Sequence, residues 1–151
     1  MTTIYDVPAD ELIRKVAQEL KEDENISPPD WSMYVKTGVN REFSPLSDDW
    51  WFTRCASLLR RIYIDGPVGV SRLRTFYGGR NRKGVRDARF AKGGESIIRG
   101  AIHQLEKAGY LGKVREGRVI SPKGQSFLDK NAYDVKKEIV KSKRIPELKK
   151  Y

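Results

Sequence analysis

The chain has very few of the side chains that build disulfides or transition-metal sites. Its 151 residues include one cysteine and one histidine. A single cysteine, Cys55, excludes an internal disulfide framework and a cysteine-rich zinc site, and His103 alone cannot supply the ligand set of a zinc centre. We therefore expect no metal and no cofactor, with Cys55 as a small core residue and His103 facing solvent or phosphate.

Long apolar stretches are lacking as well. No apolar run approaches the roughly 20 residues that span a bilayer, and the N-terminus does not follow the charged-then-apolar order of a secretory signal. We expect a soluble cytoplasmic protein without a membrane partner. The length fits one domain, which we assign to residues 1–140, and a basic tail over residues 141–151, which we expect to fray.

Acidic residues are scarce in two thirds of the chain. The net charge is +10, and it is −6 over residues 1–50, +9 over 51–100 and +7 over 101–151. This distribution gives the second and third segments a cationic surface that attracts phosphate backbones, and leaves the first segment for water or a protein. The few carboxylates of the 51–100 segment are too scattered for a two-metal nuclease, and we expect no enzyme.

The apolar residues that are present recur with helical periodicity. They predict helices over residues 9–24, 50–64, 70–77, 95–108 and 122–139, and a short helical turn over 31–36. Glu116 and Gly117 separate two short strand patterns at 110–114 and 118–121, which predicts a β-hairpin. The predicted fold class is mostly α with a small β-hairpin, and the order of elements is that of a winged-helix-like bundle of about five helices.

A long basic segment separates the third and fourth predicted helices. Residues 78–94 exceed the roughly 12–15 residues beyond which loops are usually functional or disordered. We interpret this segment as an arm that RNA orders, because arginine grips phosphate with two parallel hydrogen bonds and glycine lets a backbone come close. The candidate RNA-binding residues of the arm are Gly78, Gly79, Arg80, Arg82, Lys83, Gly84, Arg86 and Arg89.

A second basic surface follows the polar side of the 50–64 helix. The ordinary alternative is a solvated helix face, but the +9 charge of the surrounding segment favours contact with RNA. The polar side of the 95–108 helix extends this surface. The residues assigned to it are Arg54, Ser57, Arg60 and Arg61 on the first helix and Arg99 and His103 on the second.

Three aromatic residues open the 50–64 helix. Aromatic rings can stack on unpaired bases, but Trp51 and Phe52 lie on the apolar arc of this helix. We therefore expect Trp51 and Phe52 to pack in the core, with Trp50 as the more exposed ring.

Two glycine patterns fall short of phosphate-binding motifs. Residues 79–84 have the glycine spacing of a P-loop, but Val85 and Arg86 stand where Lys and Ser or Thr are required. Residues 66–69 match the glycine signature of KH domains, yet the flanking segments do not read as the strands that a KH domain needs. Neither pattern predicts a nucleotide site.

Four motifs in order along the chain resemble the S19e family of ribosomal proteins. The resemblance covers roughly residues 4–135. The motifs are Trp50-Trp51-Phe52-Thr53-Arg54-Cys55-Ala56-Ser57, Gly66-Pro67-Val68-Gly69-Val70, Tyr77-Gly78-Gly79-Arg80 and Ser121-Pro122-Lys123-Gly124.

The resemblance implies a winged-helix-like, mostly helical fold and a place in the head of the small ribosomal subunit of archaea and eukaryotes. It also implies binding to small-subunit ribosomal RNA, contact with neighbouring ribosomal proteins and a part in late subunit maturation. On the family's pattern the RNA-facing residues here are Arg54, Arg60, Arg61 and Arg80. We expect the free protein to be a monomer.

Two other functions fit parts of the pattern. A winged-helix DNA-binding transcriptional regulator would be a symmetric dimer that reads bases with Ser96, Arg99, Gly100 and His103. The long basic segment before that helix argues against it, since the turn there should take about 3–4 residues. A protein-interaction module would use the acidic 9–24 helix to bind its partner.

Overall fold

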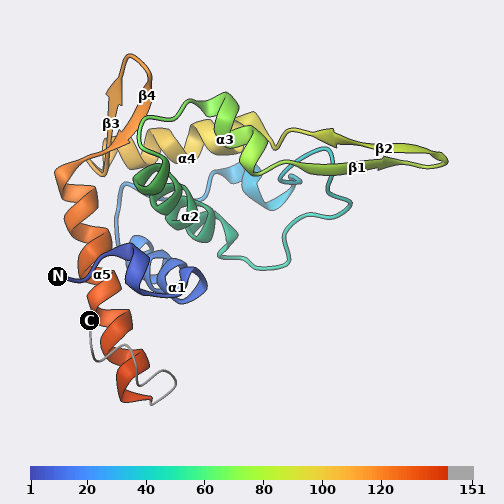
Figure 1. Cartoon of the computed structure of the whole chain (residues 1–151). Helices are drawn as coiled ribbons and strands as arrows, with labels where there is room; N and C mark the ends of the chain where they lie inside the picture. The colour runs from blue at the N-terminus through green and yellow to red at the C-terminus, as the bar shows by residue number, and fades with distance from the viewer. Residues whose placement is uncertain (143–151) are drawn as a thin grey trace.

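The structure is a computed structural model that describes residues 1–142 (Figure 1). All but the first two residues of the tail expected over 141–151 lie outside the described residues. Within residues 1–142 the helices are η1 (Ile4–Asp6), α1 (Ala9–Leu20), η2 (Asp30–Met33), α2 (Trp50–Asp65), α3 (Val70–Phe76), α4 (Glu95–Lys107) and α5 (Pro122–Lys141). The strands are β1 (Gly79–Lys83), β2 (Arg86–Ala91), β3 (Leu111–Val114) and β4 (Gly117–Ile120).

The core lies where α1, α2, α4 and α5 pack together. α1 contacts α2 and α5, and α4 contacts α2 and α3. These helices bury the side chains of Leu12, Ile102 and Leu128 completely or almost so, along with the large ring of Trp51. Cys55 is also fully buried, as expected. The helical content and the winged-helix-like order confirm the predicted fold class.

The helices α2, α3 and α4 and the β3–β4 hairpin, which we call the wing, form the winged-helix part of the molecule (Figure 1). In the wing, Leu111 pairs with Ile120 and Val114 with Gly117 in antiparallel register. The Val68 N–H donates to Arg118 O (3.1 Å), and the Arg118 N–H donates to Val68 O (2.9 Å). These two bonds fasten the wing to the turn between α2 and α3.

The start of α5 matches the sequence pattern that predicted it. Ser121 is the N-cap, its Oγ accepts a hydrogen bond from the Gly124 N–H (3.0 Å), and Pro122 takes the first helical position. The Ser121 hydroxyl also donates to Gly109 O (2.6 Å). One side chain thus caps α5 and ties it to the end of α4.

Two helical details differ from expectation. α1 ends at Leu20 and not near residue 24, because the apolar positions stop there and Asp23 closes a turn by accepting the Asn25 N–H (2.9 Å). The helical pattern of residues 70–77 puts Phe76 on the apolar side of its helix, yet this side chain is 49% exposed. Its ring lies under the guanidinium of Arg61, 4.1 Å from the ring centroid, so it serves the surface instead of the core.

The largest difference concerns residues 78–94, where we expected a long loop. β1 and β2 form an antiparallel hairpin in which Arg80 pairs with Phe90 and Asn81 with Arg89. Gly84 takes a positive φ of 63° in its turn, which glycine adopts without strain. The sequence did not predict this hairpin because its strands are mostly polar and lack the apolar alternation that marks a half-buried strand.

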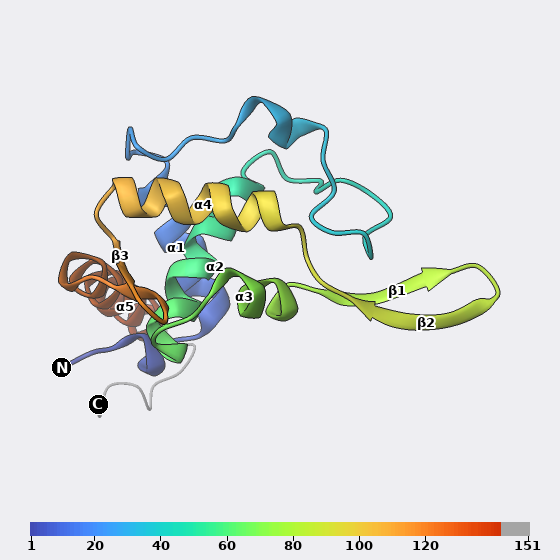
Figure 2. The ribbon, with the colours of Figure 1, turned by 90° about the horizontal axis from the view of Figure 1, so that it is seen from above.

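The chain between α1 and α2 runs alongside α4 (Figure 2). Gln104 on α4 bonds to Ser27 twice, accepting its N–H (3.3 Å) and donating to its carbonyl (2.7 Å). Farther along, the Gly94 N–H donates to Thr37 O (2.9 Å). One side of α4 is therefore occupied by the protein itself.

Candidate nucleic-acid interface

The β1–β2 hairpin projects well beyond the helical body (Figures 1 and 2). Successive side chains of a strand point to opposite faces, so Arg80 and Phe90 share one face and Asn81 and Arg89 share the other. The register shifts between Asn81 and Lys83, and Lys83 then pairs with Arg86. Basic side chains consequently lie on both faces of the ribbon.

The cations of the hairpin are available to a ligand. The side chains of Arg80, Arg82, Lys83, Arg86 and Arg89 are all exposed. Within residues 1–142 none of the five forms an ion pair with a carboxylate. A thin ribbon with five unpaired positive charges attracts a polyanion and has no intramolecular use for those charges.

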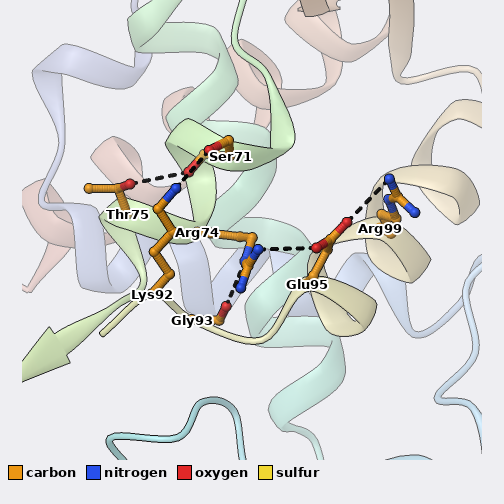
Figure 3. Close-up of polar contacts among 7 residues, drawn as sticks. All are labelled: Ser71, Arg74, Thr75, Lys92, Gly93, Glu95 and Arg99. Atoms are coloured by element: carbon orange, nitrogen blue, oxygen red, sulfur yellow. Dashed lines mark hydrogen bonds and ion pairs between the residues drawn. The ribbon is translucent and has the colours of Figure 1, made fainter. Parts of the chain in front are cut away.

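Arg74 fixes the base of the hairpin to the helical body (Figure 3). Its Nε donates to Gly93 O (3.0 Å), and its Nη1 lies 3.1 Å from Glu95 Oε2. The Gly93 N–H in turn donates to Arg74 O (2.9 Å). We call Arg74, Gly93 and Glu95 the hairpin clamp, because they join the end of α3, the chain after β2 and the start of α4.

The hairpin clamp also positions a candidate RNA-binding residue. The second oxygen of Glu95, Oε1, lies 3.2 Å from Nη2 of Arg99, whose side chain is 71% exposed (Figure 3). Lys92 adds a further tie, donating from Nζ to Ser71 Oγ on α3 (2.9 Å). Arg74 and Glu95 were not among the residues predicted for the site. Their pairing depends on how α3 and α4 meet, and no sequence spacing reveals it.

The glycines at the foot of the hairpin have intramolecular reasons to be glycine. A Cβ on Gly78 would lie 2.4 Å from Ala91 O, and one on Gly79 would lie 2.6 Å from the Asn40 side-chain nitrogen. Gly84 at the tip has open space around it. A backbone clash therefore explains Gly78, whereas the Asn40 side chain beside Gly79 can move aside. Close approach to RNA stays a prediction for all three glycines.

The polar side of α2 is more ordered than a solvated helix face. The Arg54 guanidinium lies 4.3 Å from the centroid of the Tyr77 ring, and the Tyr77 hydroxyl shares a hydrogen bond of 2.7 Å with Ser57. Arg61 is stacked on Phe76 and forms an ion pair with Asp65, 2.6 Å from Nε to Oδ2. The expected basic surface exists on α2, but Arg54 and Arg61 are half-buried and held by aromatic rings.

Burial has consequences for protonation on this face. It raises the pKa of the Tyr77 hydroxyl, so the ring stays neutral at physiological pH, although the Ser57 hydrogen bond and the Arg54 charge act in the opposite direction. It lowers the pKa of Arg54, but a guanidinium remains charged at any ordinary pH. The Arg54–Tyr77 pair is therefore a cation on a neutral ring.

The remaining candidates are divided between exposed and partly covered positions. His103 is exposed on α4, as expected, and Arg60 on α2 is half-buried. Trp51 is in the core, while Trp50 and Phe52 are half-buried and pack against it. Within residues 1–142 no cluster of three His, Cys, Asp or Glu side chains could hold a metal ion.

The geometry of α4 bears on duplex DNA reading. Gly100, one of the four residues proposed to read bases, faces the core, since a Cβ there would lie 3.2 Å from the Trp51 ring. The β1–β2 hairpin projects from the N-terminal end of α4, the end that a recognition helix presents to base edges. Both features disfavour insertion of α4 into a major groove.

Comparison with known proteins agrees with the geometry. A family model described as "Ribosomal protein S19e" matches residues 3–138. The chain belongs to the ribosomal protein S19e family. The match includes the hairpin, the hairpin clamp and the wing, so these features belong to the part of the chain that defines the family.

Archaeal relatives are similar over nearly their whole length. The small ribosomal subunit protein eS19 of Thermoplasma acidophilum is 45% identical over 139 residues, covering 92% of this chain and 93% of the relative. The proteins of the same name from Aeropyrum pernix and Haloarcula marismortui are each 44% identical, over 154 and 156 residues, covering 100% of this chain and 99% of each relative. None of the helices in the described part of the S19e-family chain is long and apolar enough to cross a membrane.

Proposed function

We propose that the chain is a structural constituent of the small ribosomal subunit and binds its ribosomal RNA through the β1–β2 hairpin and the adjoining face of α2. The observation that carries this proposal is the projecting hairpin with five exposed and unpaired basic side chains. The names of the relatives, which are small-subunit proteins, support the same role. RNA is the polyanion available in that setting.

The two surfaces have different parts in this proposal. The hairpin supplies charges that reach away from the body and meet phosphates on either side of the ribbon. The α2 face supplies Arg54, which the Tyr77 ring holds in place, and Arg61, which the Phe76 ring and an ion pair with Asp65 hold in place before RNA arrives. A guanidinium that is already fixed loses less side-chain entropy on binding phosphate than a free one does.

Further aspects of the role follow from the family resemblance. We propose that the protein lies in the head of the subunit, supports its late maturation and occurs in the cytoplasm with ribosomes. Neighbouring ribosomal proteins would meet the acidic N-terminal third, whose net charge is −6 over residues 1–50. The free chain would be a monomer, and gel filtration of the purified protein tests this point.

A charge-matched pair of variants tests the hairpin directly. Removing three hairpin cations (Arg82→Ala, Lys83→Ala and Arg86→Ala) should lower affinity for small-subunit ribosomal RNA at least about tenfold and reduce the slope of log affinity against log salt by about 2–3. The control removes three exposed lysines of α5 (Lys130→Ala, Lys137→Ala and Lys141→Ala), on the opposite side of the molecule (Figure 1). It should change both quantities much less.

Equal losses in the two triple variants would mean that RNA responds only to net charge, and the hairpin would not be the interface. A second measurement tests the cellular role. A tagged chain should sediment with small ribosomal subunits in a sucrose gradient, and the hairpin variant should shift toward the top. A tagged chain that is never found with ribosomal particles would contradict the proposal.

A further inference from the structure

A shallow cavity of about 900 Å³, widely open to solvent, lies beside the N-terminal half of α2. α1, the segment of residues 37–47, α2 and Tyr77 supply its walls. Its apolar lining is made of Ile13, Phe43, Pro45, Leu46 and Trp50. A cavity of this size is in the range that binds small molecules, and it is large enough for a nucleotide.

Arginines also line this cavity. The lining includes three arginines, Arg14, Arg41 and Arg54, and two carboxylates, Asp10 and Glu42. Its net charge is therefore positive. Within residues 1–142 neither Arg41 nor Arg54 forms an ion pair with a carboxylate. Arg54 is held in place by the Tyr77 ring. A fixed, half-buried guanidinium without a counter-charge is a site that favours an anion.

Exposed apolar side chains stand around the same cavity. Phe43 is 74% exposed and Leu46 is fully exposed, although both line the cavity. Trp50 lies on α2, with its ring centroid 5.6 Å from that of Trp51. A flat, apolar group of a ligand would cover the side chains of Phe43 and Leu46, which are exposed to water in the free protein.

We propose that this cavity binds one unpaired nucleotide of the RNA, with its base against Phe43, Leu46 and Trp50 and its phosphate at Arg41 and Arg54. The inference rests on the proposed RNA-binding function and names the form of RNA that this surface takes. A base inside a duplex cannot enter a cavity, so the nucleotide must be bulged, looped or extruded.

The surroundings of the cavity favour RNA over an acidic peptide. Arg54, Ser57 and Tyr77 belong both to the cavity lining and to the proposed phosphate-binding face of α2. A nucleotide in the cavity would therefore leave its strand running onto surfaces that already present cations. The base and the phosphate also match the two kinds of lining, apolar and guanidinium, which alternate in sites for single-stranded nucleic acid.

The test compares a fully paired RNA duplex with the same duplex carrying one bulged adenosine. The full-length chain should bind the bulged RNA about tenfold more tightly, which is within the contribution of one base stacked on aromatic side chains. Phe43→Ala should abolish this preference and leave affinity for the paired duplex unchanged. Tyr34→Ala is the matched control, because Tyr34 is 83% exposed in the same connecting chain and does not line the cavity.

A fluorescent base gives a second measurement. With 2-aminopurine in the bulge, binding of the unaltered chain should quench the fluorescence through stacking, and Phe43→Ala should restore it. Both Phe43 and Tyr34 are surface side chains, so neither variant removes core packing, and circular dichroism of each checks its fold.

The possible outcomes separate this inference from the proposed function. Equal affinity for the two duplexes, or a preference that Phe43→Ala leaves intact, overturns the nucleotide cavity while RNA binding stands. Binding of neither duplex at low salt, under conditions where the protein is folded, overturns both. A preference that Phe43→Ala removes and Tyr34→Ala keeps supports the inference.

Discussion

The molecule contains two antiparallel hairpins that are attached to the helical body in different ways. The wing is fastened to the body by the Val68–Arg118 hydrogen bonds, and Arg118 Nε lies 2.8 Å from Glu106 Oε1. The β1–β2 hairpin is held only at its foot, and its cations form no ion pairs within residues 1–142. Both hairpins carry basic residues, and Lys113 and Arg115 of the wing are exposed like the cations of the β1–β2 hairpin. The two hairpins differ in how the body holds them: the wing is fastened through Arg118, and the β1–β2 hairpin has no such contact along its strands within residues 1–142.

The largest expected difference is in the glycines of the two turns. Gly117 in the wing has a φ of 146°, and a Cβ there would lie 2.5 Å from the Val68 carbonyl. Gly117→Ala should lower the free energy of unfolding by about 3 kcal/mol or more, through backbone strain and the clash together. Gly84→Ala at the free tip meets no atom and should cost about 1 kcal/mol.

Urea denaturation of both variants measures this difference. If Gly84→Ala destabilises the protein as much as Gly117→Ala does, the hairpin tip is not free, and the contrast between the two hairpins fails.

A tyrosine precedes each hairpin, the half-buried Tyr77 before β1 and the buried Tyr110 before β3, and the two differ in how they titrate. Burial, together with the hydrogen bond that Tyr110 donates to Asp23 Oδ2 (3.1 Å), raises the pKa of Tyr110 to about 12. The unfolded chain loses this proton near pH 10, whereas the folded chain keeps it up to about pH 12. The resulting stability is fully present below pH 10 and is lost as the pH rises from 10 to about 12.

At pH 11 this loss amounts to about 1 kcal/mol. Subtracting the unfolding free energy of Tyr110→Phe from that of the unaltered chain, between pH 9 and 12, isolates it from the titration of lysines. Tyr77→Phe should show a weaker pH dependence, because the Ser57 hydrogen bond and the Arg54 charge offset part of the effect of burial on the pKa of Tyr77. A pH-independent difference for Tyr110→Phe would contradict the assignment.

Paired and unpaired arginines should separate stability from RNA binding. Arg118→Ala breaks the ion pair with Glu106, in which the side chains of Arg118 and Glu106 are 25% and 23% exposed. The loss should lower the free energy of unfolding by about 1 kcal/mol. Arg82→Ala breaks no such pair; it should leave thermal stability unchanged and weaken RNA binding. The exposed Lys113 on the wing is the control for charge alone. Loss of stability in Arg82→Ala would show a hidden partner.

The sequence predicted the helices and the wing well, and for a physical reason. Each of those elements buries one face, so apolar residues recur with its period, and caps such as Ser121 mark its ends. The β1–β2 hairpin buries no face. Its strands are held by backbone hydrogen bonds and by side chains at the foot, and neither leaves a periodic signal.

The candidate site divides in the same way. The basic residues of the hairpin were found from composition, since a polyanion-binding surface needs little more than unpaired charge. The contacts that hold the foot of the hairpin and the α2 face were not predicted: Arg74 meets Glu95 across 21 positions of chain, and Tyr77 meets Ser57 across 20. Contacts of that kind depend on how helices meet, and one sequence does not encode them in its spacing.

The smallest expected effect, and the sharpest test of positioning, concerns the hairpin clamp. Glu95→Gln weakens the links to Arg74 and Arg99 while keeping the shape of the side chain. Glu116→Gln changes the net charge equally at an exposed wing position that has no ion pair within residues 1–142. If the clamp sets the direction of the hairpin, Glu95→Gln should bind RNA about threefold less tightly than Glu116→Gln, because a ribbon that swings must be ordered again on binding. Equal affinities, measured at the same salt, would mean that RNA itself aligns the hairpin and that the clamp serves only the fold.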